Sequence, residues 1–135
     1  MLKKIYRLNW KDVNFLYRKQ NVIFWKFFWF FYFNQYPNRR YNQISFNIST
    51  KLSKHSVIRN NIKRIVYDYC RLNNFINLNL NSKFYKIFII FNKKVIDNIQ
   101  KTIETKDKKD IKSYIEEIFS NDLKNLTKKL WNHNW

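Results

Sequence analysis

The chain has 135 residues, with 27 Lys and Arg side chains against 9 Asp and Glu, and a formal net charge of +18. This length fits one domain with a single hydrophobic core, and a hydrophobic content of 45% excludes a disordered basic tail. The single cysteine, Cys70, excludes a disulfide framework or a cysteine zinc site within one chain and favours a reducing compartment.

The positive charge is concentrated in residues 1–95, which hold 19 basic and 2 acidic side chains, whereas residues 96–135 hold 8 and 7. A folded chain with this balance usually binds a polyanion, and nucleic acid is the leading candidate. The longest apolar stretch, 22–33, is shorter than the roughly 20 residues of a membrane-spanning helix. We therefore expect a soluble, unprocessed protein that binds its partner through the first 95 residues.

The first predicted element is a helix that begins at Trp10. Asn9 suits the N-cap position, and Asp12 stands three residues later, where a capping box places an acidic residue. Trp10, Val13 and Tyr17 then share one helical face.

Two strands and a turn are predicted next. Residues 22–33 are aromatic and β-branched on both faces, which predicts one central strand covered on both sides. Proline and asparagine in 36–38 predict a turn. Ile44, Phe46 and Ile48 alternate with polar residues and predict a half-buried strand.

From Ser56 to Leu72 the pattern becomes helical, with an apolar and a basic face. The apolar face contains Ile58, Ile62, Ile65 and Tyr69. The opposite face contains Asn60, Lys63, Arg64, Tyr67 and Arg71.

The C-terminal part predicts a loop at 73–82, a buried strand at 87–91 and a helix at 111–119. The tail 121–135 begins as a helix, with Leu123, Leu126 and Leu130 in register. The order α-β-β-α-β-α predicts an α/β (α+β) two-layer sandwich with a central sheet.

We predict no catalytic and no metal-binding residue in the protein itself. The basic region offers only Asp12 and Asp68 as carboxylates, and either could be a helix cap or an ion-pair partner, whereas a two-metal nuclease needs several convergent ones. No glycine loop can hold a nucleotide, because the chain has no glycine. Cys70 lies beside the apolar helix face and is expected to be a buried core thiol.

Basic residues surround the start of the predicted helix at 56–72. Lys51, Lys54 and His55 precede it, and further cations follow on its first turns. A helix N-terminus favours phosphate through its free N–H groups and its dipole. A merely solvated basic face is the alternative interpretation, but the near-absence of acidic residues here favours RNA or DNA.

The segment RNNIKR, Arg59 to Arg64, resembles the RNRxxKR-type motif of the bacterial ribonuclease P protein subunit. The flanking segments follow in the family's order: the helix segment 12–19, the aromatic strand 28–31, the strand ending in ISTK and the buried strand 87–91. The resemblance covers residues 7–120 and predicts a ribonuclease P protein-like domain at 1–120, with 121–135 as an extension. The chain departs from the family pattern at Val13, Thr50, Asn61 and Tyr67.

The resemblance implies a fold in which the motif helix forms a left-handed βαβ crossover. It implies a protein subunit that pairs, one protein per RNA, with a large catalytic RNA that removes the 5′ leader of precursor tRNA. Bound Mg²⁺ and the RNA would carry out the hydrolysis, while the protein binds the leader and strengthens metal affinity. The implied compartment is a bacterial cytosol, or an endosymbiont or organelle of bacterial origin.

The resemblance also implies two binding surfaces. The motif helix and the turn before it would contact the catalytic RNA through Lys51, Lys54, His55, Arg59, Asn60, Asn61, Lys63, Arg64 and Arg71. A cleft between the first helix and the sheet would bind the leader through Val13, Tyr17 and Phe31. The rings of Tyr17 and Phe31 could stack on bases, although either could instead be core in a chain that is 20% aromatic.

Two other functions fit parts of the sequence. A ribosomal or general RNA-binding protein without a catalytic partner would need the same charge and the same aromatic residues. Binding of the helix 56–72 to a membrane surface would need a large exposed apolar face, and that face is better used to cover the sheet.

Overall fold

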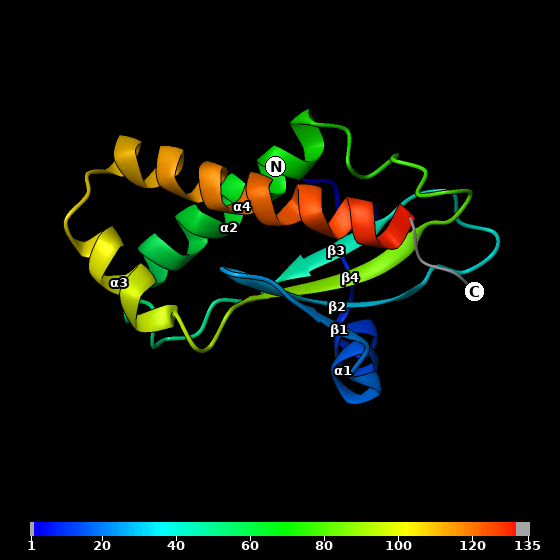
Figure 1. Ribbon diagram of the computed structural model, residues 1–135, viewed down its shortest axis with the longest axis horizontal. Helices are drawn as coiled ribbons and strands as arrows, with labels where there is room; N and C mark the ends of the chain where they lie inside the picture. Colours follow the sequence, from blue (N-terminus) through cyan, green and yellow to red (C-terminus); the bar gives the residue numbers. More distant parts are fainter. Residues whose placement is uncertain (1, 132–135) are drawn as a thin grey trace.

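A four-stranded mixed sheet lies at the centre of the computed structural model, which describes residues 2–131 (Figure 1). The strands, in the spatial order β1-β2-β4-β3, are β1 (Val22–Phe24), β2 (Phe28–Asn34), β4 (Tyr85–Phe91) and β3 (Gln43–Phe46). The helices are η1 (Lys4–Tyr6), α1 (Trp10–Lys19), α2 (Ser56–Leu72), α3 (Ile96–Glu104) and α4 (Lys108–Trp131). The predicted mixed helix and strand class is confirmed.

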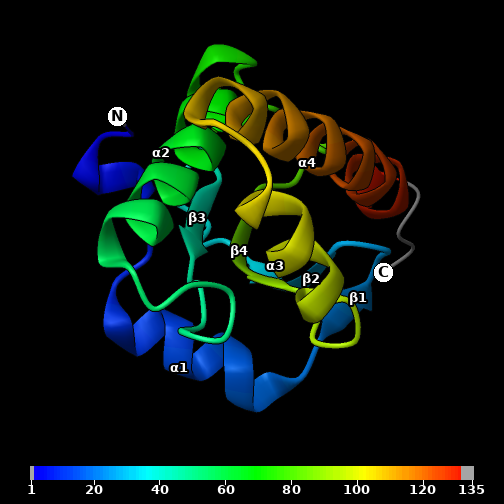
Figure 2. The same cartoon turned by 90° about the vertical axis from the view of Figure 1, so that its left-hand side faces the viewer.

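The sheet is covered by helices on both faces. Successive residues of β2 point to opposite faces, so Phe28 and Phe30 pack with Phe119 of α4, whereas Phe31 packs with Val13 of α1. Both views place α1 on the side of the sheet opposite to α2 and α4 (Figure 2). The structure therefore adds one helical layer to the predicted two-layer sandwich.

The start of α1 and the bounds of α2 agree with the prediction. Asn9 Oδ1 accepts a hydrogen bond from the N–H of Asp12 at 2.8 Å, as expected for an N-cap. α2 has the predicted bounds, and Ile62 and Ile65 of its apolar face are buried. Because β3 and β4 are parallel, α2 forms the crossover between them; its handedness stays a prediction.

The prediction of one strand over 22–33 is wrong, because the chain turns back at 25–27 and forms the hairpin β1–β2. Side chains from distant parts of the chain hold this turn: Asn92, after β4, donates through Nδ2 to the carbonyl oxygens of Trp25 and Lys26, and Asp122 of α4 acts as an acceptor. One carboxylate oxygen of the buried Asp122 accepts hydrogen bonds from the N–H groups of Phe27, at 2.9 Å, and Phe28, at 3.0 Å. Burial raises the pKa of Asp122 above its ordinary value, although these two hydrogen bonds act in the opposite direction.

The second half also differs from the prediction at element boundaries. α3 was not predicted. Its buried residues Ile96, Ile99 and Ile103 have helical spacing, which was a sufficient signal for this helix. The helix expected at 111–119 and the helical start of the tail are one continuous helix, α4, so the expected domain boundary at 120 falls inside it. The three leucines of the tail are buried in the main core, and residues 132–135 lie outside the described part.

The asparagine-rich loop at 73–82 is held in place by one buried side chain. Asn42 donates through Nδ2 to the carbonyl oxygens of Phe75, at 2.8 Å, and Leu78, at 3.0 Å. Its Oδ1 accepts from the N–H of Tyr85 at 2.7 Å. In a chain without glycine, polar residues take the left-handed backbone conformation at turns, including Asn74 and Asn81 in this loop.

Two substitutions of Asp122 should separate the contribution of its hydrogen bonds to stability from that of its charge. Asp122→Ala leaves two backbone N–H groups without an acceptor and should lower the free energy of unfolding by about 1–3 kcal/mol. Asp122→Asn keeps an amide oxygen in the same place and should retain most of the stability. Urea unfolding of the full chain measures both, and an equal loss in the two variants would contradict this role.

The same carboxylate also gives an expected pH dependence. Because its pKa is raised in the folded protein, Asp122 stabilises the fold relative to the unfolded chain most at low pH, and this contribution declines as pH rises above the ordinary value of 3.8. The stability of the wild type minus that of Asp122→Asn should therefore fall as the pH rises through this range.

Candidate nucleic-acid interface

The predicted RNA-binding residues of the turn and of α2 form one basic surface. Lys51, Lys54, His55, Asn60, Arg64 and Arg71 are exposed, and Arg59, Asn61 and Lys63 are half-buried. The N-cap His55 makes no side-chain capping hydrogen bond, and the first turn contains no acidic residue. The N-terminus of α2 therefore has the charge and the free N–H groups that favour an anion.

Arg59 has a structural contact that the sequence did not predict. Its Nη1 donates to the carbonyl oxygen of Ser53 at 2.7 Å. This bond ties the turn that precedes α2 to the first turn of the helix. Buried Leu52 anchors the same turn, so Lys51 and Lys54 are presented from a fixed backbone.

Tyr67 does not belong to the basic face, contrary to the prediction from helical spacing. Its side chain is only 7% exposed. Its hydroxyl oxygen accepts a hydrogen bond at 3.1 Å from the N–H of Phe46, the last residue of β3. At the other end of the face, Oδ1 of Asp68 lies 3.9 Å from Nε of Arg71. Such a surface ion pair contributes little to stability.

A cleft of about 440 Å³ lies beside α1 on the other face of the sheet. Val13 and Tyr17 of α1 line it, together with Trp10; their contact with a leader stays a prediction. As whole residues, Tyr17 is 45% exposed and Trp10 is 70% exposed. The remaining wall comes from the end of β4 and the segment after β3, through Phe88, Ile90, Phe91, Asn47, Ile48 and Ser49.

Phe31 supports this cleft without lining it. It is only 3% exposed and belongs to the core cluster that includes Val13 and Phe88. Its ring centroid lies 5.4 Å from that of Tyr17. The ring that can meet a base is therefore Tyr17, and Phe31 packs against it within the core.

Among the cleft residues that the sequence analysis did not name, Trp10 and Lys93 can contact a nucleic acid most directly, through a ring and a cation. Trp10 shares a helical face with Val13 and Tyr17, so its spacing was a sufficient signal. Lys93 follows β4 and lines the cleft, with its Nζ 5.9 Å from the ring centroid of Trp29. It adds a cation to a cleft that is otherwise lined by apolar, aromatic and neutral polar residues.

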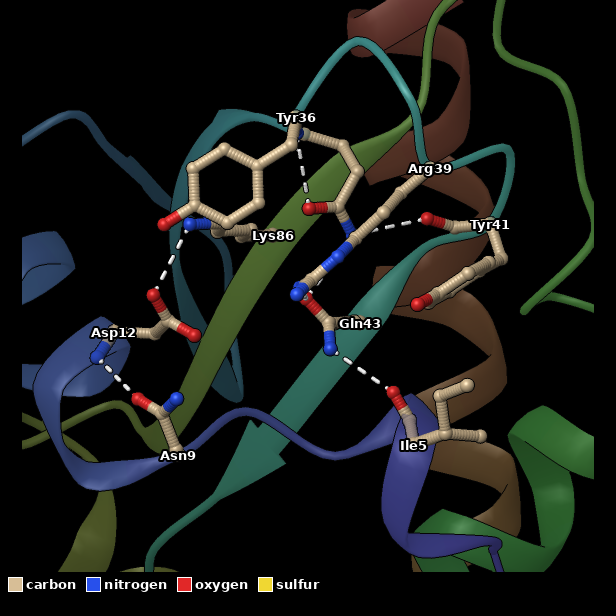
Figure 3. Close-up of polar contacts among 9 residues, drawn as sticks. Ile5, Asn9, Asp12, Tyr36, Arg39, Tyr41, Gln43 and Lys86 are labelled. Atoms are coloured by element: carbon tan, nitrogen blue, oxygen red, sulfur yellow. Dashed lines mark hydrogen bonds and ion pairs between the residues drawn. The ribbon is translucent and has the colours of Figure 1, made fainter.

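A buried ion pair connects α1 to the sheet (Figure 3). Nζ of Lys86 in β4 donates to Oδ1 of Asp12 at 3.0 Å, and it lies 3.6 Å from the ring centroid of Tyr36. Asp12 is thus an ion-pair partner, as anticipated. Removing one partner of such a pair would leave an uncompensated buried charge, which is strongly destabilising.

The cysteine thiol and the potential metal ligands of the described residues form no further site. Cys70 is a buried core thiol, as predicted, and burial raises the pKa of its thiol. Within residues 2–131, no three His, Cys, Asp or Glu side chains gather where they could hold a metal ion. None of the helices in the same range is long and apolar enough to cross a bilayer.

Comparison with known proteins identifies the family. The family model described as Ribonuclease P matches residues 2–121. The RNase P protein of Staphylococcus aureus has a similar structure, with a TM-score of 0.58 and 18% identity over 87% of this chain and 94% of that chain. No curated protein sequence matches the chain.

The RNase P protein of Thermotoga maritima is also similar, with a TM-score of 0.57 and 18% identity over 83% of this chain and 93% of that chain. Its complex with 1-(4-fluorophenyl)-2-thiourea gives a TM-score of 0.58 and 18% identity over 83% and 95%. At this identity the structural likeness supports the fold.

The two sides of α2 should respond differently to substitution. Ile62 is completely buried, so Ile62→Ala should lower the free energy of unfolding by about 2–4 kcal/mol. Arg64 is exposed, so Arg64→Ala should change stability by no more than about 0.5 kcal/mol. Only Arg64→Ala should weaken RNA binding by the folded protein.

Urea unfolding and an RNA-binding titration of both variants test this separation. If Arg64→Ala unfolds the protein, the basic face is a structural network and is not a binding surface.

Proposed function

The chain belongs to the ribonuclease P protein family, and we propose that it binds the catalytic RNA through α2 and the leader of precursor tRNA through the cleft beside α1. The observation that carries this proposal is the separation of the two surfaces by the sheet, with α2 on one face and α1 on the other (Figure 1, Figure 2). One protein is expected to bind one RNA.

The surface at α2 is suited to the backbone of a folded RNA. It carries cations and helix N–H groups but no exposed aromatic ring on its basic face, and such contacts go to phosphate oxygens and carry no base specificity. Each phosphate that is neutralised releases counterions, so the affinity should fall steeply as salt rises.

The cleft beside α1 is suited to single-stranded RNA. Tyr17 and Trp10 present exposed rings, and Lys93 adds a cation beside them. Stacking on a ring tolerates every base, which suits a subunit that must accept many different leaders. This is the physical basis for assigning the leader to the cleft.

Catalysis is assigned to the RNA partner. Mg²⁺ prefers several oxygen ligands, but Asp12 of the basic region is already paired with Lys86 and Asp68 lies beside Arg71. These residues do not fit a magnesium site, so we place Mg²⁺ on the RNA subunit and the substrate. The proposed compartment is a bacterial cytosol or an organelle of bacterial origin.

Reconstitution tests the proposed function. RNA-free protein incubated with precursor tRNA and Mg²⁺ should leave the leader intact. Addition of the cognate catalytic RNA should give cleavage at the mature 5′ end. Cleavage by the protein alone would reject the assignment of catalysis to the RNA, and a failure to stimulate any catalytic RNA would favour a general RNA-binding protein.

Replacement of Tyr17 tests the cleft. Tyr17→Ala should weaken holoenzyme binding to precursor tRNA more than to mature tRNA, because only the precursor has a leader to stack. A loss of about 1–3 kcal/mol per base corresponds to a change of roughly 5- to 150-fold in the ratio of the two affinities.

Two variants control this measurement. Tyr17→Phe keeps a ring and should retain most of the ratio, and Trp131→Ala removes an exposed ring from α4 and should leave it unchanged. Equal weakening for precursor and mature tRNA in Tyr17→Ala would place Tyr17 outside the leader site.

A further inference from the structure

A second groove, which we call the edge groove, lies at the β3 edge of the sheet. It has a volume of about 580 Å³ and is bounded by the N-terminal segment, β3 and α2. Four cationic side chains from three separate parts of the chain line it: Lys4, Arg7, Arg39 and Lys63. None of the described residues that line it is acidic.

Hydrogen bonds hold the walls of the edge groove in place (Figure 3). Gln43 of β3 donates through Nε2 to the carbonyl oxygen of Ile5 at 2.9 Å, and its Oε1 accepts from Nη1 of Arg39 at 3.0 Å. The N–H of Leu8 donates to the carbonyl oxygen of Ile44 at 2.9 Å, so the N-terminal segment follows the edge of β3. The backbone that carries Lys4 and Arg7 is therefore fixed before any ligand binds.

Arg7 indicates what kind of ligand the edge groove would take. Its Nε is buried and has no hydrogen-bond partner among the described residues. A buried donor without an acceptor costs free energy, as does the repulsion between cations that share a groove. The buried Nε has almost no accessible surface, so an oxyanion in the groove would act mainly by relieving the repulsion among the four cations.

We propose that the edge groove binds backbone phosphates of the catalytic RNA, an inference that rests on the proposed function. Lys63 belongs to α2 and lines the groove, so an RNA bound along α2 reaches the groove without interruption. The tyrosines that line the groove, Tyr41 and Tyr67, are half-buried and buried. Charge without open ring faces suits the phosphates of a folded RNA better than a single-stranded leader.

Two adjacent lysines provide a matched test. Lys4 lines the edge groove, whereas Lys3 is also exposed and lies outside its lining. We would compare Lys4→Gln/Arg7→Gln with the control Lys3→Gln/Lys112→Gln, which removes the same charge elsewhere. Affinity for the catalytic RNA is measured for the full-length protein over a series of salt concentrations.

The edge-groove variant should bind the catalytic RNA about 10-fold more weakly or worse, as expected when hydrogen bonds to charged groups are removed. The slope of log K against log salt should become shallower by about 0.7–0.9 for each phosphate that the variant no longer neutralises. The control should keep the wild-type slope, and the ratio of precursor to mature tRNA affinity should stay unchanged in both. Lys4→Gln alone, at an exposed position, repeats the test if Arg7→Gln reduces stability.

Two results would overturn the proposal. One is an edge-groove variant that binds the catalytic RNA with the affinity and slope of the control. The other is a loss confined to precursor tRNA, which would assign the groove to the leader. A wild-type protein that does not bind the catalytic RNA would reject the proposed function itself. If Arg64→Ala weakens binding to the catalytic RNA and the edge-groove variant does not, only the edge groove is rejected.

Discussion

The pairing of β4 with two neighbours is the constraint on which the rest of the structure depends. β4 pairs antiparallel with β2 and parallel with β3, and the parallel pair requires a crossover helix, which is α2. Its consecutive residues Ile87 and Phe88 are buried in core clusters on opposite faces of the sheet. The sheet therefore holds α2 and α1 apart, which separates the basic surface from the aromatic cleft.

Two of the few carboxylates in this positively charged chain are buried and stabilise the fold. Asp12 neutralises the buried Lys86, and Asp122, from the nearly neutral C-terminal part 96–135, accepts hydrogen bonds from the β1–β2 turn. Most of the cations lie on the surface, where they repel one another until a polyanion covers them. The two buried carboxylates therefore have structural roles and lie outside the proposed RNA-binding surface.

Features that depend on neighbours along the chain were predictable, and features that depend on distant residues were not. The cap at Asn9 and the bounds of α2 follow from local spacing. The break in 22–33 depends on Asp122, 95 positions from Phe27. Tyr67 has the spacing of the basic face, but its hydroxyl accepts the N–H of Phe46 at the end of β3. The edge groove likewise joins residues that no single motif contains.

The central claim is that the two faces of the sheet contact two different RNAs, and site-specific crosslinking tests it most directly. A photoreactive residue placed at Asn60 on α2 or at Asn14 beside the cleft, both exposed, would be activated in the holoenzyme bound to precursor tRNA. The account predicts that position 60 crosslinks to the catalytic RNA and position 14 to the leader. Crosslinks from both positions to the same RNA, or the reverse assignment, would contradict it.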